Sequence, residues 1–194
     1  MIEVKTIVQA IFFLLKKNGD SPMEKIKLVK LMYLSDKYHL LKYGRTITND
    51  MYFAMPMGPV GSTVLNVLDF KKSDFMKSEY QYATIFLEEK GSNSFKPKNV
   101  KNRLDALSDT DKEALDFVYE NFGSMETWGR KGLVEFTHKY PEWARYKDLF
   151  ESQKTRREPI ATEELLTRIP GDPFDISEKH IKESRAILRE DKCL

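Results

Sequence analysis

Apolar side chains recur at intervals of three and four residues near the N-terminus, and this spacing predicts a first helix. Lys16, Lys17 and then Gly19 follow, which suit the negative end of a helix and a left-handed turn. The apolar positions of this helix are Val4, Ile7, Val8, Ile11, Phe12, Leu14 and Leu15.

A second helix is predicted directly afterwards. Ser21 is a candidate N-cap, with Pro22 at the first helical position and Glu24 reaching back, as in a capping box. The helix should run to Tyr43 and stop at Gly44. Its apolar and aromatic residues point in nearly every direction on a helical wheel, which is typical of a helix at the centre of a bundle. We therefore expect this helix to form the core of the fold.

The remaining pattern predicts shorter elements. Residues 51–55 read as a short strand or an extended segment, and Pro59 is expected to open a third helix through residue 68. Residues 84–88 and 94–96 read as the strands of a hairpin. Ser108 should cap a helix that ends at Gly123, and Ser124 should cap another that contains Trp128. Pro141 is expected to begin a further short helix, and a peripheral one is expected near 162–169.

These elements predict a mainly α fold, a compact helical domain with a small β-hairpin. We expect this domain to span residues 1–170. From residue 151 onward the apolar stripes are thin and charged residues are frequent. Residues 171–194 are therefore expected to form a charged C-terminal tail that is helical, mobile or bound to a partner.

Composition sets limits on the class of protein. With 41% hydrophobic and 12% aromatic residues among 194, the chain has enough apolar material for a core, which excludes a wholly disordered protein. A single cysteine, Cys193, excludes an intramolecular disulfide or a thiolate metal cluster built from this chain. No apolar run approaches the length of a membrane span, so we expect a cytoplasmic protein that does not enter the membrane.

The common nucleotide-binding and hydrolase motifs are absent from the sequence. Asp36 and His39 lie three residues apart on the second helix and share one stripe, so a metal half-site or an acid–base pair is conceivable. A metal site would need at least one more ligand, with His138 the first candidate. We give more weight to a structural polar pair, and we expect no enzymatic activity, cofactor or metal.

A second alternative is a nucleic-acid-binding regulator. Residues 1–103 carry 17 Lys and Arg against 10 Asp and Glu, whereas residues 104–194 carry 15 against 20. Cations on and just after the second helix could contact phosphates, namely Lys27, Lys30, Lys37, Lys42 and Arg45. Apolar residues share that face. Lysines at the edge of a packed apolar surface therefore explain the pattern better than a phosphate-binding strip does.

Residues 51–60 combine three methionines and two aromatics with two prolines. Methionine and aromatic side chains make adaptable contact surfaces. The segment is also explained by a buried crossover beneath the second helix. Both interpretations remain open at this point.

Residues 27–68 also strongly resemble the Panacea domain, a family of phage- and mobile-element-associated proteins that includes SocA-like antitoxins and proteolytic adaptors. Three segments occur in family order: Lys-Leu-x-Lys-Leu-x-Tyr at 27–33, Tyr-Gly-Arg-x-Ile-x-x-Asp at 43–50 and Ala-Met-Pro-x-Gly-Pro-Val at 54–60. Later residues, including Trp128 and Trp143, extend the resemblance over most of 4–170. The resemblance implies a non-catalytic antitoxin that neutralises a toxin encoded beside it, by direct binding or by delivery to an ATP-dependent protease.

We expect the partner to bind beside the second helix. Protein interfaces concentrate binding energy in aromatic, methionine and arginine side chains with charged groups at the rim. The candidate partner-binding residues, with the two lysines at the edge, are Lys30, Tyr33, Lys37, Tyr43, Arg45, Tyr52, Met55 and Met57.

Overall fold

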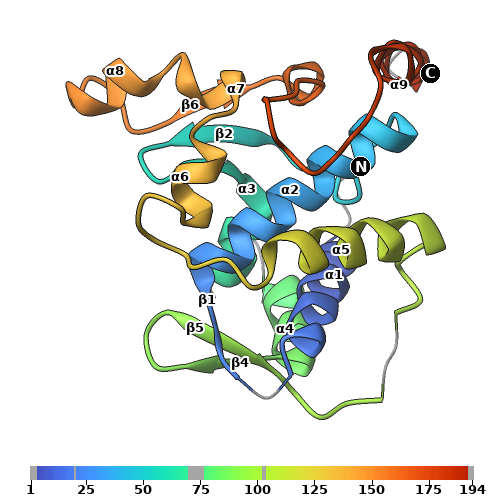
Figure 1. Ribbon diagram of the computed structural model, residues 1–194. Helices are drawn as coiled ribbons and strands as arrows, with labels where there is room; N and C mark the ends of the chain where they lie inside the picture. Colours follow the sequence, from blue (N-terminus) through green and yellow to red (C-terminus); the bar gives the residue numbers. More distant parts are fainter. Residues whose placement is uncertain (1–3, 20, 70–76, 102–103, 192–194) are drawn as a thin grey trace.

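A computed structural model describes residues 4–19, 21–69, 77–101 and 104–191 (Figure 1). Cys193 lies outside the described residues. The fold is mainly helical, as predicted, and the described residues also form two small antiparallel sheets. The helices are α1 (Val4–Lys17), α2 (Lys25–Tyr43), α3 (Ser62–Leu68), α4 (Lys77–Phe86), α5 (Asp109–Phe122), α6 (Leu133–Thr137), α7 (Pro141–Ala144), α8 (Lys147–Glu151), the 3-10 helix η2 (Thr162–Leu165) and α9 (Glu178–Asp191).

Helix α2 crosses the middle of the molecule, with α1 and α5 on one side and β2 (Tyr52–Met55), α6 and α7 on the other (Figure 1). Its residues from Leu28 to Leu41 are all buried, which confirms the central helix predicted from the all-round apolar pattern. Gly44 ends it in the left-handed conformation at φ 76°, and its amide donates to the carbonyl of Leu40 at 3.0 Å. The C-terminal boundary of this helix is therefore confirmed.

The start of α2 differs from the prediction. The helix begins at Lys25, and Ser21 does not cap it. Met23 and Glu24 instead form strand β1 (Met23–Glu24), which pairs with residues 94–95. The amide of Lys25 also donates to the carbonyl of Asn93 at 2.9 Å. A pairing with a distant hairpin thus replaces the local capping box.

That hairpin is confirmed with shifted boundaries. It consists of β4 (Leu87–Lys90) and β5 (Ser94–Pro97), and β1 adds a third strand in the order β1-β5-β4. Residues 84–86, predicted to be in a strand, belong to the end of α4.

A second sheet has the order β3-β2-β6 and consists of β2 (Tyr52–Met55), β3 (Gly58–Gly61) and β6 (Glu158–Ile160). The prediction of a strand at 51–55 is confirmed. The prediction that Pro59 opens a helix is wrong, because Pro59 pairs with Ala54 within β3 and α3 begins only at Ser62. The carboxylate of Asp50 accepts hydrogen bonds from the amides of Thr63 and Val64, so the N-terminus of α3 is capped from across the strand pair.

Ser108 caps α5 as predicted. Its hydroxyl accepts from the amide of Asp111, whose carboxylate accepts in return from the amide of Ser108 at 2.8 Å. The next predicted helix does not begin at Ser124. Residues 124–132 form a loop that includes Trp128, and α6 starts at Leu133.

Helix α9 packs against the C-terminal end of α2. Its buried face contains Ile181, Ser184 and Leu188. Ser184 Oγ donates to the carbonyl of Leu41 at 2.8 Å, and His180 Nε2 lies 2.6 Å from the carbonyl of Lys42. These contacts satisfy backbone acceptors that the end of a helix leaves without partners. The helix predicted near 162–169 is limited to η2.

Replacing Leu31 with alanine tests the position of the core. Leu31 is fully buried on α2, so Leu31→Ala should lower the free energy of unfolding by about 2–5 kcal/mol through the cavity it opens. Urea denaturation followed by circular dichroism measures this loss. Ile85→Ala on α4 removes similar apolar bulk from a side chain that is 52% exposed and serves as the control. A loss below about 1 kcal/mol for Leu31→Ala would contradict the proposed core.

Candidate partner-binding surface

The centre of the molecule contains a buried ion pair between α2 and α7. Lys37 Nζ donates to Glu142 at 2.7 Å, to the carbonyl of Leu165 at 2.8 Å and to the hydroxyl of Thr167 at 2.9 Å. Tyr33 also donates to Glu142. The side chains of Lys37 and Glu142 have no solvent exposure. Burial lowers the pKa of Lys37, and the carboxylate of Glu142 opposes this shift.

Lys30 is fully buried on the same helix without such a carboxylate. Its ammonium nitrogen donates to the carbonyl of Pro59 at 2.7 Å, and none of the described residues forms an ion pair with it. Burial holds the pKa of Lys30 well below its usual range. Gly58 lies directly over this nitrogen at φ 99°, and a Cβ at that position would come within 2.6 Å of it. Gly58 and Pro59 of the third motif therefore pack directly against the buried Lys30 side chain, where a residue with a Cβ in place of Gly58 would clash.

These contacts correct the expected surface. Lys30 and Lys37 are not at the rim of a groove, and Tyr33 and Tyr52 are buried as well. Four of the eight candidate residues therefore stabilise the interior and are not accessible to a partner. Tyr43 and Arg45 lie at the far end of α2, where they bind Glu113 and Asp111 of α5.

Asp36 and His39 do not converge on one site. Asp36 accepts from the amides of Ile47 and Thr48, each at 2.9 Å, whereas His39 contacts the carbonyl of Arg45 and the carboxylate of Asp111. Burial raises the pKa of Asp36 to about 6 and lowers the pKa of His39. Within the part of the chain that the structure describes, no three His, Cys, Asp or Glu side chains are grouped as metal ligands would be.

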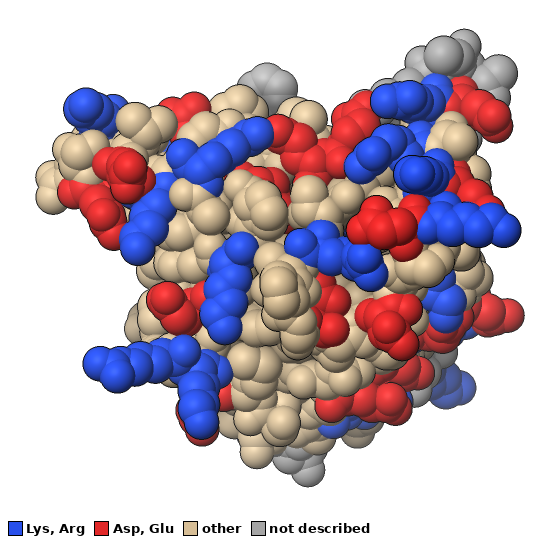
Figure 2. Space-filling model, turned by 45° about the horizontal axis from the view of Figure 1, so that its top comes forward, with Lys and Arg blue, Asp and Glu red and all other residues tan. Residues whose placement is uncertain are grey.

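The proposed cationic strip is not continuous either. Lys30 and Lys37 are buried, Lys42 pairs with Glu113, and Lys27 donates to the carbonyl of Met125 at 2.8 Å. Figure 2 shows that acidic and basic side chains are interspersed on the face seen there. The five cations of the nucleic-acid alternative therefore do not form one exposed basic face.

Alternation along β2 separates buried from accessible residues. Tyr52 and Ala54 point into the core, whereas Phe53 and Met55 are only partly buried. Met51 and Met57 continue the outward positions and are 58% and 52% exposed. The guanidinium of Arg157 lies 3.4 Å from the centre of the Phe53 ring. We call Met51, Phe53, Met55 and Met57 the outer β2 surface.

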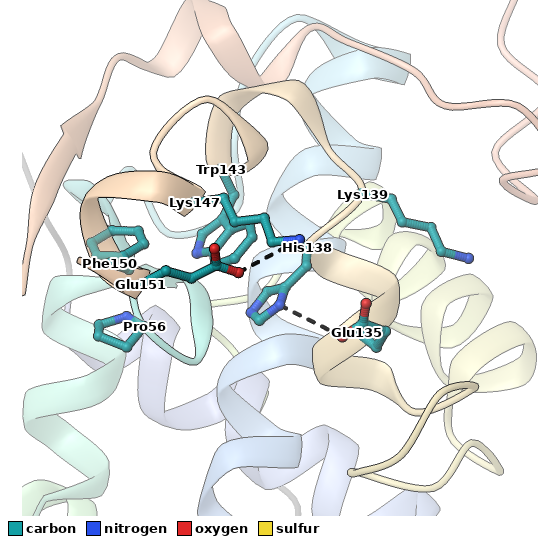
Figure 3. A pocket seen from close by; sticks show the side chains of 8 residues that line it. All are labelled: Pro56, Glu135, His138, Lys139, Trp143, Lys147, Phe150 and Glu151. Atoms are coloured by element: carbon teal, nitrogen blue, oxygen red, sulfur yellow. Dashed lines mark ion pairs between the residues drawn. The ribbon is translucent and has the colours of Figure 1, made fainter. Parts of the chain in front are cut away.

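A groove of about 440 Å³ adjoins this surface (Figure 3). Trp143 and His138 stack in parallel at 3.6 Å on one side, and Pro56 and Phe150 add apolar walls. Charged residues at the rim include Lys147 and Glu151, whose charged atoms lie 3.6 Å apart. The complete lining consists of Pro56, Glu135, His138, Lys139, Trp143, Lys147, Phe150 and Glu151.

The groove joins the outer β2 surface through the turn between β2 and β3. Trp143 Nε1 donates to the carbonyl of Met55 at 2.8 Å, and Pro56 follows directly. Burial lowers the pKa of His138 to about 4, so its ring is neutral at neutral pH. The sequence did not indicate this groove. Strand alternation could have identified Phe53, but no local pattern connects residue 56 with residues 135–151.

We predict different effects for removing the two buried lysines. Lys37→Met leaves Glu142 as an unpaired buried charge and should lower the free energy of unfolding by about 3–5 kcal/mol. Lys30→Met removes a hydrogen-bond donor that has no carboxylate partner and should cost less, about 1–3 kcal/mol, through the unsatisfied carbonyl of Pro59. Urea denaturation of both variants at pH 7 measures the difference. Equal losses would show that the Lys37–Glu142 pair does not have the central role assigned to it.

None of the helices that the structure describes is both long enough and apolar enough to cross a membrane. No curated protein and no solved structure matches the chain. A family model does match residues 28–144, and it is described as the SocA-like antitoxin family with a Panacea domain. The match includes the second and third motifs and extends through Trp143 of the groove. The chain therefore belongs to the SocA-like antitoxin family, Panacea domain.

Proposed function

We propose that this protein is the antitoxin of a toxin–antitoxin pair and neutralises its toxin by binding it directly. Family membership supports a toxin–antitoxin role and a protein partner. The single observation that carries direct binding is the outer β2 surface beside the Trp143 groove. We propose that the toxin covers both.

The chemistry of the surface suits a protein partner. Phe53 with the guanidinium of Arg157, and the two exposed methionines, supply the side-chain types in which interfaces concentrate binding energy. Half-buried Met55 and the groove wall at Phe150 provide adjoining apolar contact. Charged residues around the groove would form a polar rim. Eight partner-binding residues were predicted from the sequence. Of these, Met55 and Met57 lie in the interface proposed here, whereas Tyr43 and Arg45 would require a separate contact.

Delivery of the toxin to an ATP-dependent protease is the second route that the family implies. Direct binding and delivery make different predictions for the amount of toxin. Binding alone leaves the amount unchanged, and delivery lowers it. Quantifying the toxin by immunoblot after synthesis is stopped, with and without this protein, therefore distinguishes the two routes.

Coexpression with the product of the adjacent gene tests the proposed function. We expect the neighbour alone to arrest growth, and we expect this protein to restore growth because it occupies the toxin. Colony counts under separate inducible promoters measure the rescue. A neighbour that is harmless by itself, or a toxic one that is not rescued, would contradict the antitoxin function.

Met57→Ala should weaken toxin binding by about tenfold or more and leave thermal unfolding unchanged, because Met57 is 52% exposed at the centre of the proposed contact. Isothermal titration calorimetry and a melting curve measure the two properties. Ile85→Ala on α4 is the matched control, since Ile85 is equally exposed away from the surface. If both variants bind like the wild type, the toxin does not use the outer β2 surface.

A further inference from the structure

The loop between α5 and α6 presents a tryptophan that is half exposed to solvent. Trp128 is 51% exposed, and none of the described residues forms a hydrogen bond or ring contact with it. Large aromatic side chains are usually buried because each removes a large apolar area from water. An unpartnered tryptophan at a loop therefore needs an explanation beyond stability.

This loop has a defined shape. The amide of Leu133 donates to the carbonyl of Glu126 at 2.8 Å, and the amide of Val134 donates to the carbonyl of Thr127 at 3.1 Å. Gly129 adopts φ 89°, and a Cβ on Gly132 would come within 2.4 Å of the carbonyl oxygen of Trp128. Lys27 also donates to the loop from α2, to the carbonyl of Met125 at 2.8 Å. The backbone that carries Trp128 is consequently held in place before any partner arrives.

Two cations follow the tryptophan. Arg130 and Lys131 are exposed, and neither forms an ion pair with any described residue. Many other cations are already engaged: Lys42 pairs with Glu113, Lys17 with Asp116 and Lys25 with Asp69. Arg130 and Lys131 are therefore available to an external anion.

We propose that Trp128, Arg130 and Lys131 form a docking site for an acidic segment of a protein partner. An apolar side chain of that segment would cover the indole, and its Asp or Glu residues would pair with the two cations. Two adjacent cations and one aromatic ring match a short acidic peptide better than a nucleic acid, whose affinity comes largely from many Lys and Arg contacts with phosphates. The loop lies on the same side of the molecule as the turn between β2 and β3 (Figure 1), so one partner can reach both.

A selection from a displayed library of random peptides tests this site without any toxin. We expect enriched peptides to contain Asp or Glu next to an apolar residue. Fluorescence anisotropy of a synthetic enriched peptide should show about tenfold weaker binding to Trp128→Ala and to R130E/K131E, and binding should also weaken with added salt. Thermal melting of each variant establishes that the fold is intact.

The matched control is K182E/R189E, which reverses two exposed charges on α9, on the opposite side of Figure 1, with the same change in net charge. It should bind the peptide like the wild type. Failure to enrich acidic peptides, or equal binding by Trp128→Ala, would overturn the proposal. So would binding of a labelled single-stranded oligonucleotide that Trp128→Ala abolishes, because the site would then belong to nucleic acid. None of these outcomes depends on the growth-rescue experiment, so the two proposals fail separately.

Discussion

The buried polar side chains of α2 are the constraint on which the rest of the structure depends. Lys37 in this helix binds Glu142 of α7 and the backbone at the last residue of η2, while Asp36 binds the backbone of the turn that follows α2. Lys30 holds β3, and His39 holds α5 through Asp111. A displaced segment would leave a buried charge or donor unsatisfied, which costs more than the lost apolar contact. Strand β3, helices α5, α7 and α9 and the 3-10 helix η2 are thus each joined to α2 by at least one specific polar contact.

This constraint also explains how far the sequence predicts the fold. The all-round apolar pattern placed α2 at the centre, and Gly44 and the Ser108 capping box marked true helix boundaries, because each of these signals is local. Ser21 misled because pairing with a distant hairpin decides the conformation of the residues that follow it, and Pro59 misled because it pairs with Ala54 in the hairpin of β2 and β3. Residues 23–24 pair with β5 in a sheet. The carboxylate of Asp50 caps the N-terminus of α3, which begins after Pro59.

The candidate site was only partly predictable for a similar reason. The segment 51–60 was open to two interpretations, as a buried crossover and as a contact surface, and alternation along β2 places some of its side chains in the core and leaves others accessible. Tyr52 is interior while Met57 is exposed, although their residue types suit either role. Lys30 and Lys37 resembled rim cations because helical spacing does not reveal that the carbonyl of Pro59 meets Lys30 in the core and that Glu142, more than a hundred residues away, meets Lys37. The Trp143 groove arises from segments that only the tertiary fold brings together.

Lysines of the central helix α2 also bind the backbone of exposed loops. Lys30 binds the carbonyl of Pro59 and Trp143 binds the carbonyl of Met55, so the turn that presents Met57 is held on both sides from within. One helical turn earlier, Lys27 fixes the loop that carries Trp128. Both exposed loops are therefore shaped by side chains of the central helix or of elements packed on it. A surface fixed in this way loses little conformational entropy when a partner binds, so more of the contact energy remains as affinity.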